Sequence, residues 1–213
     1  GYANPRSDVI VMLFGKKDNA KFAAQKPLIH EPGTHWHYSS GTTNILCSAL
    51  REEIGGDYCD YLRFPYQELF HKIGMYSALF ETDGTGTFVG SSFLYATARD
   101  WARFGQLYLQ DGVWNGERIL PEGWIEYSLR RTKISRQQRY GAHFWLPQPN
   151  PPGRKEYVPV PKDLYYLSGH YGQYVSIIPS KKLVVVRMGQ TDGSAVWNQY
   201  LFLDKILDAI NSE

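Results

Sequence analysis

An apolar hairpin near the carboxyl end of the sequence dictates much of what the chain can form. Residues 173–178 and 183–188 are rich in valine, isoleucine and other apolar side chains, and residues 179–182 between them read as a turn. Two apolar runs joined by so short a turn are typical of buried antiparallel strands. Residues 196–211 have the apolar spacing of an amphipathic helix, which we expect to cover one face of that sheet.

The sequence before this hairpin has mostly helical patterns. Apolar residues recur at helical spacing over 44–54 until Gly55 and Gly56, and again over 97–111. The remaining predicted segments are helices at 7–14, 19–26 and 57–70, the last redirected at Pro65, a hairpin turn at Asn115-Gly116, and a strand at 140–146. Helices first and a sheet afterwards, closed by a helix, predict an α+β protein. Residues 1–135 are mostly helical in this prediction, and residues 136–213 supply the sheet strands and the C-terminal helix.

Composition and charge exclude several classes of partner. The formal charge is +2, from 23 basic and 21 acidic residues, and the basic residues are scattered. This pattern favours neither nucleic acid nor a membrane surface. No apolar stretch approaches membrane-spanning length. Cys47 and Cys59 lie too far apart for a metal knuckle, so we expect free buried thiols. Four neighbouring side chains could form a zinc site: His30, Glu31, His35 and His37. They match no familiar ligand spacing, so we expect no metal, and we also expect no cofactor.

Tyr38 and Ser40 stand two residues apart, immediately before the helix predicted at 44–54. At a helix start, the unpaired N–H groups and the helix dipole favour a phenolate, so a tyrosine there is well placed to move protons. A tyrosine followed by an ordinary serine or threonine helix cap explains the same residues. The segment alone leaves both interpretations open.

Four segments in order resemble the serine β-lactamase and penicillin-binding-protein superfamily, on its class C β-lactamase and esterase side. They are residues 38–40, 69–75, 96–106 with 112–116, and 169–173. Within it, the chain most resembles the nylon-oligomer hydrolases and related esterases, because residues 2–8 match the stretch that carries their substrate-contacting tyrosine. The resemblance implies a β-lactamase/transpeptidase-like fold. This chain, residues 1–213, would be the C-terminal part of a single such domain, lacking its N-terminal helix and first strands.

The resemblance also implies roles for four catalytic residues. Tyr38 matches the tyrosine that shuttles a proton between nucleophile and leaving group, and Ser40 matches the hydrogen-bonding residue two positions later. His170 stands where other members carry the lysine of Lys-Thr-Gly on an edge strand. The N–H of Gln173 is the expected half of an oxyanion hole.

Three further residues are implied in substrate binding. Tyr2 matches the substrate-contacting tyrosine, Tyr171 and Gly172 complete the motif that begins at His170, and the glycine permits close backbone approach. Histidine in place of lysine weakens the charge that would hold a β-lactam carboxylate, which favours ester or amide substrates without one.

The family nucleophile is absent from this sequence. It is the serine of Ser-x-x-Lys, and no serine here has lysine three residues later. Ser48 and Ser128 have arginine at that place, which cannot accept a proton, and both follow Tyr38 whereas the family nucleophile precedes it. We therefore expect the nucleophile in a segment upstream of Gly1, on the same or a separate chain.

The prediction is a serine hydrolase that forms an acyl-enzyme on a small ester or amide. The alternatives are β-lactamase or D-amino-acid peptidase activity, and a non-catalytic homologue that binds a ligand or partner. A zinc hydrolase using His30, His35 and His37 is more distant. The resemblance allows periplasmic or exported as well as cytoplasmic localisation, which the sequence leaves open.

Overall fold

A computed structural model describes residues 4–135, 138–147, 160–191 and 197–212. The chain divides into two compact units, Gly1–Thr97 and Ala98–Glu213. Within the described ranges, no helix combines the length and the apolar character that crossing a membrane requires.

The first unit is built around one long helix and the short helices that pack on it. Its elements are α1 (Asp8–Gly15), α2 (Asn19–Ala24), α3 (Ser40–Ile54), α4 (Tyr58–Pro65), the π-helix η1 (Tyr66–Phe70), β1 (Leu79–Phe80) and β2 (Leu94–Tyr95). Helix α2 packs closely on α3, and α1 contacts both. Helix α3 ends at Ile54, and the positive φ of 62° at Gly55 suits a glycine after a helix.

Helix α4 holds the β1–β2 region of this unit. Asp57 caps α4 in a reciprocal capping box with Asp60. The hydroxyl of Tyr61 accepts from the Phe88 N–H at 3.0 Å, and the hydroxyl of Tyr66 accepts from the Phe80 N–H at 3.0 Å. Tyr61 of α4 and Tyr66 of η1 therefore tie the chain around Phe80 and Phe88 back onto these two helices.

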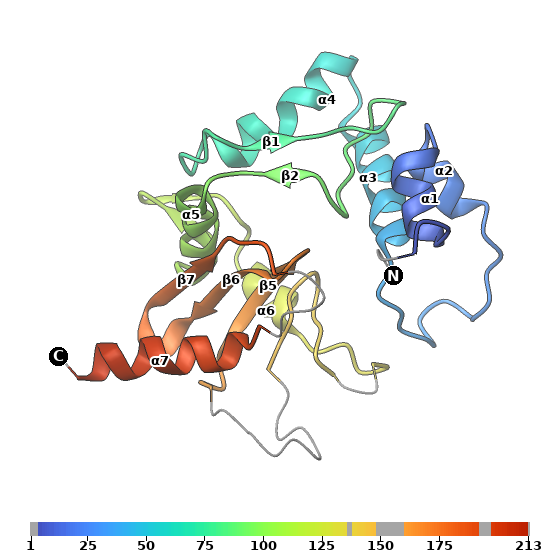
Figure 1. The fold of residues 1–213 in the computed structure, drawn as a ribbon. Coiled ribbons are helices and arrows are strands. Elements are labelled where there is room, and N and C mark those ends of the chain that lie inside the picture. Colours follow the sequence, from blue (N-terminus) through green and yellow to red (C-terminus); the bar gives the residue numbers. More distant parts are fainter. Residues whose placement is uncertain (1–3, 136–137, 148–159, 192–196, 213) are drawn as a thin grey trace. The chain divides into compact units, whose positions relative to one another are not determined.

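The second unit is a helix–sheet–helix arrangement (Figure 1). Its elements are α5 (Ala98–Leu109), β3 (Val113–Trp114), β4 (Glu117–Arg118), α6 (Trp124–Leu129), β5 (Tyr165–Gly169), β6 (Gln173–Ile178), the 3₁₀ turn η2 (Pro179–Lys181), β7 (Leu183–Arg187) and α7 (Gln199–Asn211). Strands β5, β6 and β7 form an antiparallel sheet in that order. The predicted apolar hairpin is β6 and β7, and it is confirmed.

Alternate residues of the sheet face two different helices. Tyr165 and Val175 pack with Tyr108 of α5 in one core cluster, while Tyr166 packs with Leu203 of α7 in the other. Figure 1 shows α5 and α7 on opposite faces of β5–β7. The alternation follows from the two-residue period of a strand. The predicted α+β class and the covering role of the C-terminal helix are confirmed.

Two details differ from the sequence predictions. Residues 140–146 do not form a continuous strand, because Gly141 N–H donates to the Phe144 carbonyl at 2.9 Å and His143 has a φ of 65°, so the segment folds back on itself. Only isolated bridges remain, one of them from Trp145 to Tyr166 on β5. Strand β5 itself was not predicted. Small residues interrupt the apolar alternation of this strand, and the sequence just before it is rich in proline, so the strand pattern is weak.

Candidate active site

The amino end of α3 carries the Tyr38-Ser39-Ser40 motif. The helix begins at Ser40 rather than at Asn44, so Ser40 is its first residue and is half-buried. Ser39 has extended backbone angles, and its hydroxyl accepts from the Thr42 N–H at 3.3 Å. The cap interpretation is therefore confirmed for Ser39. Tyr38 lies just before the cap and is 53% exposed.

Helix α3 is anchored by two small or polar residues near this end. Asn44 is buried, and its amide donates to Ser91 Oγ at 3.2 Å. Gly41 faces α2 so closely that a Cβ at this position would stand 2.9 Å from the Cβ of Ala23. The glycine therefore sets how near α2 and α3 approach, one residue from Ser40.

Replacing Gly41 with alanine is expected to destabilise the first unit despite alanine's higher helix propensity. The propensity gain is about 1 kcal/mol, whereas overpacking costs about 1–3 kcal/mol, and the obstacle here is a rigid Ala23 Cβ. We expect a net loss of about 1 kcal/mol, measured by urea denaturation. Gly15→Ala is the matched control, because a Cβ there meets only Val11 Cγ1 at 4.0 Å. Equal effects of the two variants would contradict this account of Gly41.

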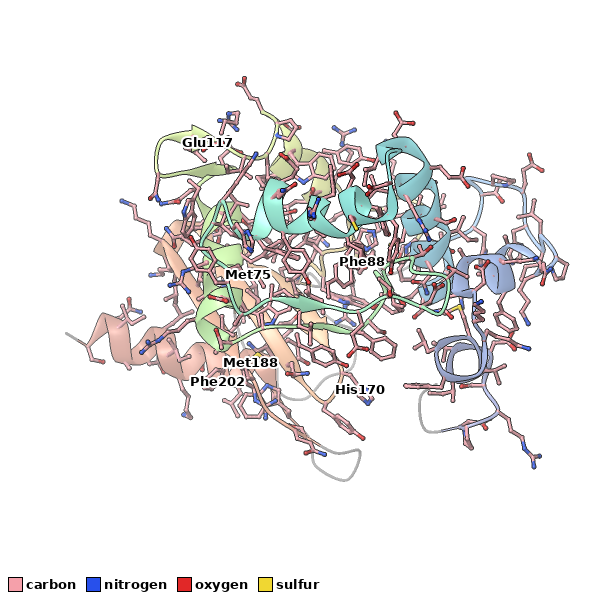
Figure 2. The ribbon with its side chains drawn as sticks, turned by 90° about the horizontal axis from the view of Figure 1, so that it is seen from above. Met75, Phe88, Glu117, His170, Met188 and Phe202 are labelled. Atoms are coloured by element: carbon pink, nitrogen blue, oxygen red, sulfur yellow. The ribbon has the colours of Figure 1, made fainter. Side chains whose placement is uncertain are left out.

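The second group of predicted residues lies in the turn between β5 and β6. Gly169 ends β5 and pairs with Gln173, the first residue of β6. His170, Tyr171 and Gly172 form the turn between them, so the prediction that this motif lies on an edge strand is wrong. Tyr171 and Gly172 have φ values of 59° and 72°, a left-handed backbone that reverses the chain and ends the strand. Figure 2 labels His170 at this end of the sheet.

Several hydrogen bonds hold this turn. The Gln173 side chain donates to the His170 carbonyl at 3.1 Å, and the Thr191 N–H donates to the Tyr171 carbonyl at 2.9 Å. Arg187, the last residue of β7, donates to the carbonyl of Gly172. The rings of His170 and Tyr171 lie 4.0 Å apart between centroids. The turn is thus fixed from inside and from the neighbouring strand.

The remaining predictions have different outcomes. Tyr2 lies outside the described residues. The His30 and His35 rings stack at 3.9 Å, and among the described residues no three His, Cys, Asp or Glu side chains gather in a way that could hold a metal ion. Both cysteines are free, but Cys59 is exposed rather than buried. Burial raises the pKa of the half-buried Cys47 thiol, which disfavours its reactive thiolate.

Sequence reasoning missed a polar network centred on Asp83. Its carboxylate accepts from the N–H of Asn19 at 3.0 Å, from the N–H and hydroxyl of Thr85 at 2.9 and 2.6 Å, and from the N–H of Thr87 at 3.2 Å. Burial alone would raise the pKa of Asp83, but these hydrogen bonds together lower it. The run Asp83-Gly-Thr-Gly-Thr87 is a recognisable turn signal, although its partner Asn19 is 64 residues away.

A cavity of about 400 Å³ lies next to this network, and it is distinct from the motif at the start of α3. Its walls include Arg51, Asp57 and Tyr58, but neither Tyr38 nor Ser40. Arg51 donates to the Thr85 carbonyl at 2.9 Å and its guanidinium lies 5.5 Å from the Tyr58 ring centroid. These contacts belong to the architecture of the first unit.

The structure therefore brings the predicted residues into two groups. Tyr38 and Ser40 lie together at the amino end of α3 in the first unit. His170, Tyr171, Gly172 and Gln173 lie together at the β5–β6 turn in the second unit.

Comparisons with known proteins cover both groups. The family model described as beta-lactamase matches residues 3–203. An uncharacterised protein of Alkalihalophilus pseudofirmus is 28% identical over 112 residues, which are 51% of this chain and 33% of that protein. The chain thus spans about a third of this curated relative.

Two solved structures share the fold. A Bacillus anthracis protein assigned as a 6-aminohexanoate-dimer hydrolase matches with a TM-score of 0.65 and 25% identity, over 91% of this chain and 47% of that one. A Bacteroides dorei protein assigned as a beta-lactamase matches with a TM-score of 0.64 and 13% identity, over 90% of this chain and 65% of that one. The second likeness shows the fold alone.

Proposed function

Because this chain belongs to the beta-lactamase family, we propose that it forms part of a serine hydrolase that cleaves a small ester or amide through an acyl-enzyme. The observation that carries the proposal is the family match over residues 3–203, which includes both the α3 motif and the β5–β6 turn. The assigned activity of the Bacillus anthracis neighbour, hydrolysis of a 6-aminohexanoate dimer, supports this substrate class.

In the proposed reaction, a serine outside this chain supplies the nucleophile. Its hydroxyl oxygen forms a bond to the substrate carbonyl carbon, and its proton passes through Tyr38 to the departing alcohol or amine as the ester or amide bond breaks. Water then attacks the acyl-enzyme, releases the acid and returns the proton to the serine. Ser40 contributes a hydrogen bond to this arrangement.

The β5–β6 turn is proposed to stabilise the negative oxygen that forms in both steps. The N–H of Gln173 is the proposed donor, and Gly172 leaves room for the substrate to approach the backbone. His170 puts an imidazole where the family has the ammonium group of the Lys-Thr-Gly lysine. We therefore place β-lactams, which need a partner for their carboxylate, behind neutral esters and amides.

The test is denaturing intact-mass analysis of the full-length protein before and after treatment with a fluorophosphonate probe. The expected result is one probe adduct on a serine upstream of Gly1, prevented by prior incubation with a short-chain ester. Faster turnover of a chromogenic cephalosporin than of the ester would assign β-lactamase activity instead. Absence of any adduct on folded protein would overturn the hydrolase proposal in favour of a ligand-binding homologue.

A further inference from the structure

The carbonyl of the peptide bond between Gly172 and Gln173 accepts a hydrogen bond from a residue that has no role in the reaction proposed above. The Gly172 carbonyl accepts a hydrogen bond from Nη1 of Arg187. The N–H of this same peptide belongs to Gln173 and is the proposed oxyanion donor. Any group that fixes the carbonyl of a planar peptide also fixes the direction of its N–H.

Arg187 is held so that its guanidinium keeps one orientation. Nη2 donates to Thr191 Oγ1 at 2.7 Å, while the guanidinium carbon lies 3.8 Å from the Trp197 ring centroid. The Trp197 indole N–H donates to Gln199 Oε1 at 2.8 Å, and the Gln199 amide donates to buried Ser176 Oγ at 3.0 Å. The guanidinium is thus clamped between the turn and a hydrogen-bonded chain that reaches the middle of β6.

A positive charge on the carbonyl side of a peptide also strengthens its N–H as a donor. Hydrogen bonds in a chain polarise one another, and a charged donor has a larger effect than a neutral one. A lysine in place of Arg187 would keep the charge, but its single nitrogen would not reproduce the fork that joins Gly172 and Thr191.

We propose that Arg187 is a positioning residue for the oxyanion hole, which orients and polarises the Gly172–Gln173 peptide without touching the substrate. This inference rests on the proposed function. It assigns to a strand residue, outside the β5–β6 turn, a part in stabilising the transition state.

The test compares Arg187→Met, Arg187→Lys and Arg118→Met in the full-length protein. Arg118 is a matched control, because its Nη1 also donates to backbone carbonyls of the second unit, those of Asp111 at 2.9 Å and Leu120 at 3.2 Å. We expect Arg187→Met to lower kcat for a short-chain ester about 10- to 100-fold with little change in KM, since a misplaced donor loses part of its stabilisation. Arg187→Lys should fall between Arg187→Met and the wild type, and Arg118→Met should stay within about twofold of the wild type, as expected away from the chemistry.

Two further readouts separate positioning from simple loss of structure. Affinity for a boronic acid, which mimics the tetrahedral intermediate, should fall with kcat, while affinity for the product acid should not. The backbone amide signal of Gln173 in an NMR spectrum should shift in Arg187→Met and stay in place in Arg118→Met.

The possible results distinguish this inference from the proposed function. Full kcat in folded Arg187→Met, equal losses in both methionine variants, or an unmoved Gln173 signal would each overturn the inference while the hydrolase proposal stands. A wild-type protein that neither turns over esters nor reacts with the probe would overturn the catalytic role along with the proposed function. The Gln173 signal would then show only whether Arg187 fixes the orientation of the Gly172–Gln173 peptide.

Discussion

Replacing Tyr38 with phenylalanine in the full-length protein is expected to lower kcat for ester hydrolysis by about 10²- to 10⁴-fold, the usual contribution of a general acid–base group. The change removes one hydroxyl and keeps the ring. Since the side chain is 53% exposed and precedes the Ser39 cap, the variant should fold as well as the wild type. The loss would therefore report chemistry and not stability.

A matched tyrosine on the same unit tests that reasoning. Tyr76 is 76% exposed, and Tyr76→Phe is expected to leave kcat within about twofold of the wild type, as surface substitutions usually do. Initial rates with a short-chain ester and the rate of fluorophosphonate labelling should fall together in Tyr38→Phe, because both need an activated serine. Wild-type rates in this variant would remove Tyr38 from the proton path while leaving the family membership untouched.

Replacing Asp83 with alanine is expected to cost the first unit about 3 kcal/mol of unfolding free energy. The carboxylate accepts four hydrogen bonds, three of them from backbone N–H groups that would be left without this acceptor. Each buried donor left unpaired costs about 1–3 kcal/mol, and water reaching this half-exposed site reduces the sum. One of these donors is the N–H of Asn19 at the start of α2, where a negative charge is also favourable.

Urea denaturation of Asp83→Ala, Asp83→Asn and Glu53→Ala checks this expectation. Asparagine keeps the acceptor for Thr85 and Thr87 but can place its NH₂ against the Asn19 N–H, so its loss should be smaller than that of alanine. Glu53 is an exposed carboxylate on α3, and its replacement should change stability by less than about 0.5 kcal/mol. Equal stability of all three variants would show that the Asp83 network contributes nothing measurable.

The same network predicts a pH dependence with a definite sign. The pKa of Asp83 is lowered in the folded state, so its contribution is complete above the ordinary aspartate value of about 4 and is lost as pH falls through the lower folded pKa. Wild-type stability should therefore drop more steeply below about pH 4 than that of Asp83→Asn, which has no charge to lose there. Parallel curves in acid would contradict the lowered pKa.

The predictions of the helices and of the apolar hairpin rested on the local periodicity of apolar residues. The helical spacing before Gly55 and the paired apolar runs around 179–182 each depend on residues within one turn or one hairpin, and α3, β6 and β7 are found there. The motif at residues 38–40 was also placed correctly next to a helix. These features are local, so neighbouring residues contain the necessary information.

The errors occurred where the chain reverses at residues that rarely adopt a left-handed backbone. Residues 140–146 have a strand-like alternation, yet a left-handed His143 and the Gly141–Phe144 hydrogen bond fold them back. His170 was expected on a strand, but β5 stops at Gly169 because Tyr171 and Gly172 reverse the chain. Backbone reversal at a tyrosine has no clear local signal, since positive φ is rare for such residues.

The amino-acid sequence by itself determined the family, through four motifs in a fixed order, and it determined α3 and the β6–β7 hairpin, whose patterns lie within short runs of the chain. Only the tertiary structure decided which side chain supports which backbone group. Arg187 reaches the carbonyl of Gly172 and Asp83 reaches the N–H of Asn19, across 15 and 64 positions respectively. The lone charge of Arg187 in an apolar strand and the carboxylate of Asp83 in a turn each indicate that a partner is needed. Which backbone group becomes that partner depends on the packing of the whole unit.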